Sequence, residues 1–109
     1  MIPGANSNLS WSEQYRIVAK QWNDANAAAD LLKETKDAML SQMMLKQGDM
    51  PVSRAEMIVK ASQEWTDFIK SMVEARREAN YLKVKKEYVR MKFMEYLSEN
   101  ANKREEMRL

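Results

Sequence analysis

The chain has 109 residues, of which 45% are hydrophobic and 31% are charged, and its net charge is +2. With two Gly and two Pro, it is neither low-complexity nor collagen-like, and it lacks the turn residues that a β-sandwich needs every ~8–12 residues. The absence of Cys and His excludes disulfides, thiolate nucleophiles and the usual zinc sites, and removes the commonest general base.

The chain opens on a polar segment and then enters a long helical pattern. Residues 1–9 are expected to form an extended N-terminal arm, since Pro3 and Gly4 come early and polar residues follow. The first predicted helix covers 10–47, which contains no Gly or Pro. It starts with a capping box, in which the Ser10 hydroxyl accepts from the third helical amide.

A short loop at 48–52 separates this helix from a second. Gly48 is the residue that most readily adopts the left-handed conformation at a helix end. Ser53 and Glu56 then fit another capping box. A second helix is predicted over 54–104, again without Gly or Pro.

Each predicted helix carries an apolar stripe with steps of three and four residues, interrupted by a single Lys. The first stripe consists of Trp11, Tyr15, Val18, Trp22, Ala25, Ala29, Leu32, Lys36, Met39 and Met43, and the second of Ile58, Ala61, Trp65, Phe68, Met72, Ala75, Ala79, Leu82, Lys86, Val89, Phe93 and Tyr96. Such stripes, joined by a short loop, are typical of antiparallel neighbours in a coiled coil. We therefore predict an all-α fold, an antiparallel two-helix coiled-coil hairpin over 10–109 that self-associates into a helical bundle.

Two registers of this hairpin are consistent with the loop. One register sets Ala29 opposite Ala75, so that small residues meet at mid-length. A shift of one heptad instead sets Trp22 opposite Ala75, which pairs a large residue with a small one. We favour the first register.

The second helix has a further apolar side, opposite its stripe, which the first helix cannot cover. Exposed apolar residues are often ordinary scatter, but here four of them line up at helical spacing and others flank the stripe beyond them. We predict that they bind a second copy of the chain or a larger protein. The candidate partner-binding residues, which we call the docking face, are Tyr81, Val84, Tyr88, Met91, Phe93, Met94 and Leu97.

Basic residues border this side, with seven basic and two acidic residues over 76–92. Such a stripe could follow phosphates while tyrosines stack on bases. The alternative is a solvated flank that sets partner choice, and we favour it because acidic residues dilute the field and no known nucleic-acid motif is present. The candidate phosphate-binding residues are Arg76, Arg77, Lys83, Lys85, Arg90 and Lys92.

Catalytic patterns are missing from the sequence. There is no Gly-rich phosphate loop and no nucleophile elbow. We therefore expect no enzyme activity, no cofactor, no metal and no small-molecule substrate. No stretch has the ~18–20 consecutive apolar residues of a membrane helix, and the N-terminus lacks a signal pattern, so we expect a cytoplasmic protein without membrane contact.

The segment from Glu95 to Arg104 reads Glu-Tyr-Leu-Ser-Glu-Asn-Ala-Asn-Lys-Arg. It resembles the ending of small α-helical early-region proteins of tailed phages and prophages, in which the pattern is roughly Glu-Trp-x-Ser-x-Asn-Ala-x-Arg-Arg. Tyr96 stands where that pattern often has Trp, and Lys103 where it has Arg. The resemblance covers about thirty residues, including the charged helix before this ending, and carries over no catalytic residue.

This resemblance implies a phage setting, the host bacterial cytoplasm and a neighbourhood of DNA metabolism. We expect a non-enzymatic accessory or inhibitory protein that binds a protein of recombination, replication or host-defence machinery through its helices. The alternatives are a nucleic-acid-binding accessory protein that uses the basic stripe, and a structural component of virion assembly.

Overall fold

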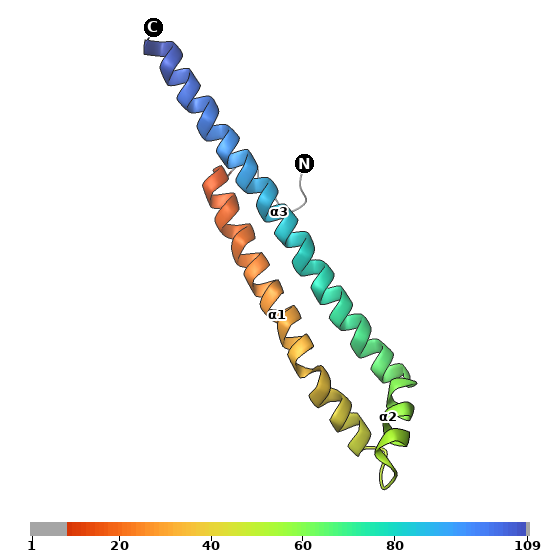
Figure 1. Cartoon of the computed structure of the whole chain (residues 1–109). Helices are drawn as coiled ribbons and strands as arrows, with labels where there is room; N and C mark the ends of the chain where they lie inside the picture. The colour runs from red at the N-terminus through yellow and green to blue at the C-terminus, as the bar shows by residue number, and fades with distance from the viewer. Residues whose placement is uncertain (1–8, 109) are drawn as a thin grey trace. The chain divides into compact units, whose positions relative to one another are not determined.

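The structure is a computed structural model that describes residues 9–108. Over these residues it contains three helices and no strand, so the expected all-α class is confirmed (Figure 1). The expected arm over 1–9 lies outside the described residues apart from Leu9.

The helices are α1 (Trp11–Leu45), α2 (Val52–Lys60) and α3 (Gln63–Arg108). They contribute to two compact units. Among the described residues, unit 1 comprises 9–24 and 80–108, and unit 2 comprises 25–79.

The start of α1 is fixed by Ser10, as the sequence predicts. The Glu13 amide donates to the Ser10 hydroxyl oxygen at 3.2 Å, and the Gln14 amide donates to the Ser10 carbonyl at 2.9 Å. The Glu13 carboxylate does not complete the capping box, because it accepts hydrogen bonds from Arg16 one turn later.

Gly48 follows α1 with a φ of +90°. This left-handed backbone conformation is strained for any residue that has a Cβ atom, so Gly is favoured here. Its amide donates to the Leu45 carbonyl at 3.4 Å, which satisfies one of the free carbonyls at the end of the helix. The left-handed cap predicted at this position is therefore confirmed.

The second predicted capping box is wrong. α2 begins at Val52, one residue before Ser53, and its N-cap is Pro51, which makes no side-chain cap. The Arg54 and Ala55 amides instead donate to the Pro51 carbonyl at 3.1 and 3.0 Å. Because Pro fixes φ near its helical value, this residue can start the helix without a capping hydroxyl.

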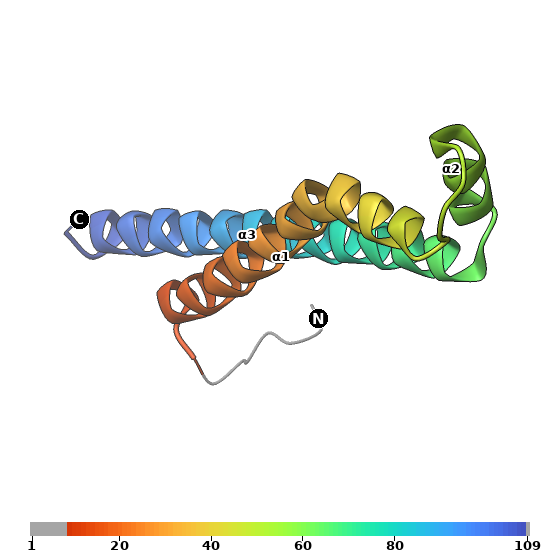
Figure 2. The same ribbon diagram turned by 90° about the horizontal axis from the view of Figure 1, so that it is seen from below.

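The single helix predicted over 54–104 is also wrong, because the chain turns at Ala61 and Ser62 to give α2 and α3 as separate helices (Figure 2). The Ser62 hydroxyl donates to the Val59 carbonyl at 2.6 Å and accepts from the Trp65 amide at 3.2 Å. One side chain therefore satisfies the end of α2 and the start of α3. Ser competes with the backbone for hydrogen bonds in this way, which a search for Gly and Pro does not detect.

The break explains the core of unit 2. Met43 of α1, Val59 of α2 and Trp65 of α3 are buried together, and the Trp65 ring stacks on Phe68 at a centroid distance of 5.6 Å. The predicted stripe residues Ile58 and Ala61 are exposed, because the turn rotates α2 so that Ala55 and Val59 point inward instead.

Within unit 2, α1 and α3 are antiparallel, since Met43 lies with Trp65 near one end and Asp30 binds Arg76 near the other. The Arg76 guanidinium donates to Asn26 at 2.8 Å and to Asp30 at 2.5 Å. These two partners lie on either side of position 28, which faces Arg76 in the register that pairs Ala29 with Ala75. The favoured register is therefore the one observed in this unit.

In unit 1, Val18 of α1 is buried, as are Leu82 and Val89 of α3. The Lys86 ammonium lies 4.0 Å from the centre of the Trp22 ring, a cation–π contact that joins the two helices. No helix of residues 9–108 combines the length and apolar character needed to cross a membrane.

Candidate docking face on the third helix

The docking face lies on α3 within unit 1, and its first four residues, Tyr81, Val84, Tyr88 and Met91, lie on the side of the helix turned away from its buried residues. Leu82, Lys85 and Val89 are buried, whereas Val84 is 69% exposed and Met91 is 64% exposed. Tyr81 and Tyr88 are also exposed, at 45% and 42%. The predicted surplus of apolar residues is therefore solvent-accessible in the isolated chain.

The docking face continues beyond Met91 toward the C-terminus, and its remaining residues differ in exposure. Phe93 is half-buried, while Met94 and Leu97 are exposed. Tyr96, which the sequence predicts on the buried stripe, is exposed as well. The expected register sets Trp11, the first residue of α1, opposite Phe93. The apolar stripe of α3 therefore extends past the residues that have a counterpart in α1.

Acidic residues neutralise two of the basic residues beside the face. Arg90 pairs with Glu87 at 3.2 Å, and Lys92 pairs with Glu95 at 3.2 Å. The hydrogen bond to Glu95 raises the pKa of the Lys92 ammonium, with a further contribution from the Glu95 charge. The same ammonium lies 5.8 Å from the centre of the Tyr88 ring, at the border of the face.

The six candidate phosphate-binding residues do not share one setting. Arg76 and Arg77 belong to unit 2, where Arg76 is engaged by Asn26 and Asp30. Lys85, in unit 1, is only 8% exposed and packs into the helix pair. Lys83 and Arg77 are exposed.

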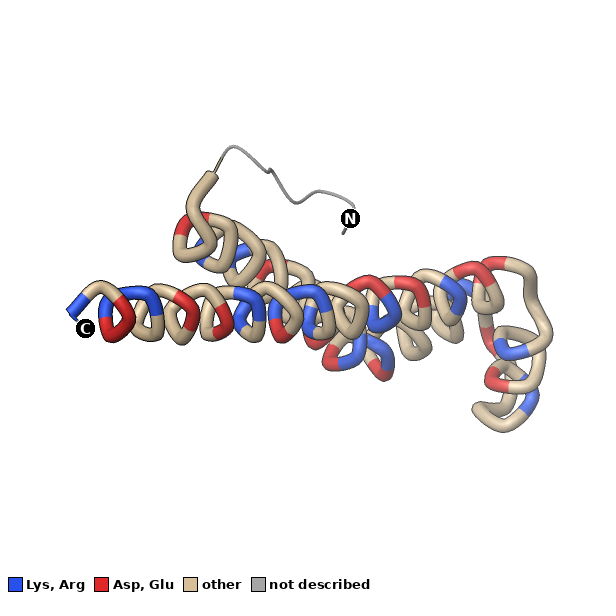
Figure 3. Tube along the Cα trace, turned by 90° about the horizontal axis from the view of Figure 1, so that it is seen from above, with Lys and Arg blue, Asp and Glu red and all other residues tan. Residues whose placement is uncertain are grey.

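Figure 3 shows that acidic residues are interspersed with the basic ones along α3. These ion pairs and the burial of Lys85 leave fewer basic groups open to phosphate than the sequence count suggests. This arrangement favours the interpretation of the stripe as a solvated flank.

Sequence reasoning missed a second set of exposed apolar residues, which lies in unit 2 around the loop. Leu45, Val52 and Met57 are all more than two-thirds exposed. An apolar residue on each side of a loop is a signal that could have identified this set.

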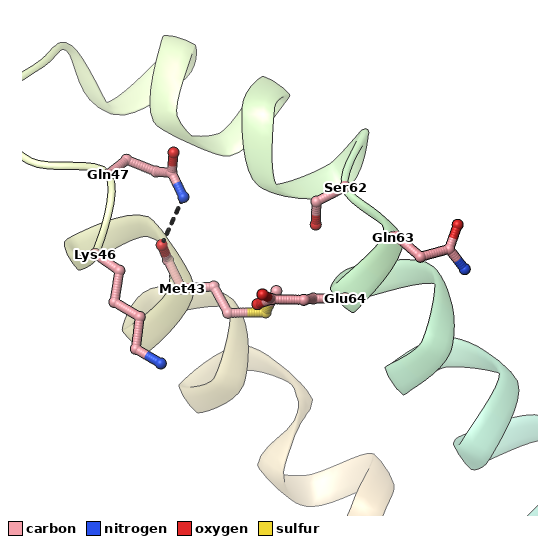
Figure 4. A pocket seen from close by; sticks show the side chains of 6 residues that line it. All are labelled: Met43, Lys46, Gln47, Ser62, Gln63 and Glu64. Atoms are coloured by element: carbon pink, nitrogen blue, oxygen red, sulfur yellow. Dashed lines mark hydrogen bonds between the residues drawn. The ribbon is translucent and has the colours of Figure 1, made fainter.

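A pocket of about 340 Å³ lies in unit 2 between the end of α1 and the junction of α2 with α3 (Figure 4). Lys46 and Glu64 give it one charge of each sign, and the Gln47 amide on its rim donates to the Met43 carbonyl at 3.4 Å. Its one hydroxyl, on Ser62, already serves as a donor and an acceptor at the helix junction. The pocket therefore brings together no nucleophile with a base.

Within residues 9–108, no group of three or more carboxylates comes close enough to hold a metal ion. Comparison of the chain with protein-family models, curated proteins and solved structures gives no match.

Proposed function

We propose that this protein is a non-enzymatic accessory or inhibitory factor that acts by presenting the docking face to other protein chains. The observation that carries the proposal is the row of Tyr81, Val84, Tyr88 and Met91, exposed at helical spacing on α3. Exposed apolar area costs ~25 cal/mol per Å² relative to burial, so covering such a row is favourable. Tyr and Met are also typical of residues at protein interfaces.

The biological setting of the proposal comes from the resemblance of residues 95–104 to the ending of phage early-region proteins. In that setting the target is a protein of recombination, replication or host-defence machinery in the bacterial cytoplasm. The exposed face and the absence of catalytic motifs in the sequence both support binding rather than catalysis.

A nucleic-acid-binding accessory role is the alternative, and it rests on the exposed Lys83 and Arg77. It is less well supported, because Arg76, Arg90 and Lys92 are paired with carboxylates. A role in virion assembly would use the same apolar face and predicts that the protein is retained in purified particles.

The proposal is tested by affinity capture from a bacterial host lysate, followed by mass spectrometry. The double variant Val84→Glu, Tyr88→Glu should lose the captured protein while keeping its helical circular dichroism spectrum. The matched control is Val73→Glu, which places the same charge at an exposed valine of the same helix, outside the face. An identical set of captured proteins from wild type and the double variant would contradict the proposal.

A further inference from the structure

The charges along α3 in unit 1 change sign from one half of the docking face to the other. Residues 81–92 carry five basic residues and one acidic residue, whereas residues 93–102 carry Glu95 and Glu99 and no basic residue. Apolar residues are present in both halves, with Tyr88 and Met91 in the first and Met94 and Leu97 in the second. Each half therefore has the chemistry that would complement the other.

We propose that the chain that covers the docking face, when no target is bound, is a second copy of this protein with its α3 antiparallel to the first. This inference rests on the proposed function, because it takes the face to be a protein-binding surface. It goes further by naming the occupant and its direction.

In an antiparallel pair centred between Lys92 and Phe93, segments of opposite charge lie side by side, and apolar residues of one copy meet apolar residues of the other. At the same level along the two helices, Met91 of one copy meets Met94 of the other. Residues 83–92, in which basic residues predominate, then lie level with residues 93–102 of the second copy, which carry Glu95 and Glu99 and no basic residue, and this favours the pair electrostatically.

The same register sets Val84 level with Ala101 of the second copy. Ala101 is exposed and small, so it would let the helices approach closely at this level. The pairing would then extend over residues 84–101, with the symmetry of an isologous dimer, in which each copy offers the same patch.

A parallel pair would bury similar apolar side chains but would set residues 81–92, which carry a net charge of +4, beside the same segment of the second copy. Like charges on two packed helices lie within or near one Debye length of each other, which is about 8 Å at physiological salt, so their repulsion is only partly screened. The charge pattern of α3 therefore selects the antiparallel direction.

Cysteine cross-linking tests both the occupant and its direction, because the natural chain contains no Cys. Val84→Cys and Ala101→Cys are made separately, and one of the two carries an affinity tag, so that mixed and self-linked dimers differ in size. In the antiparallel pair the two Val84 positions are about 25 Å apart along the axis, too far for a disulfide. Mild oxidation of the mixture should give several-fold more mixed dimer than either self-linked dimer.

Sedimentation of the unlinked protein completes the test. Wild type and Val73→Glu should sediment as dimers, and Val84→Glu, Tyr88→Glu as a monomer with unchanged helical content. Self-linked Val84→Cys dimers, in excess over mixed dimers, would overturn the antiparallel direction. A monomeric wild type would overturn self-pairing altogether.

These results are separable from the proposed function. A monomer whose capture of a host protein depends on Val84 and Tyr88 overturns self-pairing and leaves the proposed function standing. A cross-linked antiparallel dimer whose capture of host proteins does not depend on the face supports self-pairing and overturns the proposed function.

Discussion

The Ser62 hydroxyl serves two helix ends, and its removal has a defined cost. Ser62→Ala should lower the free energy of unfolding by about 1 kcal/mol, since it removes the N-cap of α3. It also removes the donor to the Val59 carbonyl. Urea denaturation followed by circular dichroism measures the change.

Ser71→Ala is the control for this prediction. The Ser71 hydroxyl donates to the Asp67 carbonyl at 3.0 Å within α3, a bond that does not strengthen a helix. Because Ala has the higher helix propensity, this variant should be as stable as wild type or slightly more stable. An equal loss of stability in both variants would show that Ser62 does not act as a cap.

The Glu13 carboxylate gives unit 1 a pH-dependent contact. Hydrogen bonds from the Arg16 side chain hold the pKa of Glu13 below its ordinary value of 4.5. Since the folded pKa is the lower one, the contribution to stability is complete above the unfolded pKa and is lost as the pH falls through the folded pKa.

Titration of the Glu13 side chain by NMR checks this prediction. Arg16→Gln should raise the pKa of Glu13 toward 4.5, because the charged donor is gone. Lys20→Gln, which removes the partner of Asp24 one turn later, should leave the pKa of Glu13 unchanged. A wild-type pKa equal to that of Arg16→Gln would refute the pairing.

At the scale of the elements, α2 depends on one inward valine. Val59 is 1% exposed and packs with Met43 and Trp65. Val59→Thr should lower the free energy of unfolding by about 2 kcal/mol, because it buries a hydroxyl of nearly the same volume in an apolar site. Thermal and chemical denaturation measure this loss.

The matched substitution Val52→Thr lies on the same helix at a residue that is 71% exposed. It should change stability by less than about 0.5 kcal/mol, as surface substitutions generally do. If the two variants were equally stable, the inward face of α2 would be assigned wrongly.

Much of the helical core follows from the stripe of apolar residues in the sequence. Val18, Ala29 and Met43 of α1, and Trp65 and Leu82 of α3, were expected on the buried side and are buried. A period of three and four residues suffices for this, because it depends only on helix geometry and on the burial of apolar area.

The break between α2 and α3 could not be predicted in the same way. Ser62 fits a helix interior almost as well as other polar residues, and its role as a cap appears only when Val59 and Trp65 pack together. The stripes also predict that Lys36 and Lys86 are partly buried, but Lys36 is exposed, and Lys85 is more buried than the half-buried Lys86. Neighbouring side chains on a helix point about 100° apart. When two of them lie on either side of the centre of the buried face, a small rotation of that face decides which one is the more buried.

For the whole molecule, the arrangement of charge predicts weak interaction with nucleic acid. Lys85 is buried, and Arg76, Arg90 and Lys92 have carboxylate partners, so few counterions would be released on binding. Fluorescence anisotropy with labelled single-stranded DNA should show no saturable binding at physiological salt.

Charge reversal at Arg76, Lys83 and Arg90 is the matched test of this statement. It should leave the anisotropy unchanged, because there is no bound state to lose. Saturable binding to the wild type with a steep salt dependence, abolished in the reversed variant, would contradict the prediction and favour the nucleic-acid alternative.

The methionines of the chain differ sharply in their access to solvent. Met91 and Met94 on the docking face are exposed, whereas Met43 in the core of unit 2 is buried. Hydrogen peroxide oxidises methionine to a polar sulfoxide, and accessible thioethers react first. Mild oxidation would therefore make the docking face polar while the helices stay folded, and methionine sulfoxide reductases would restore it.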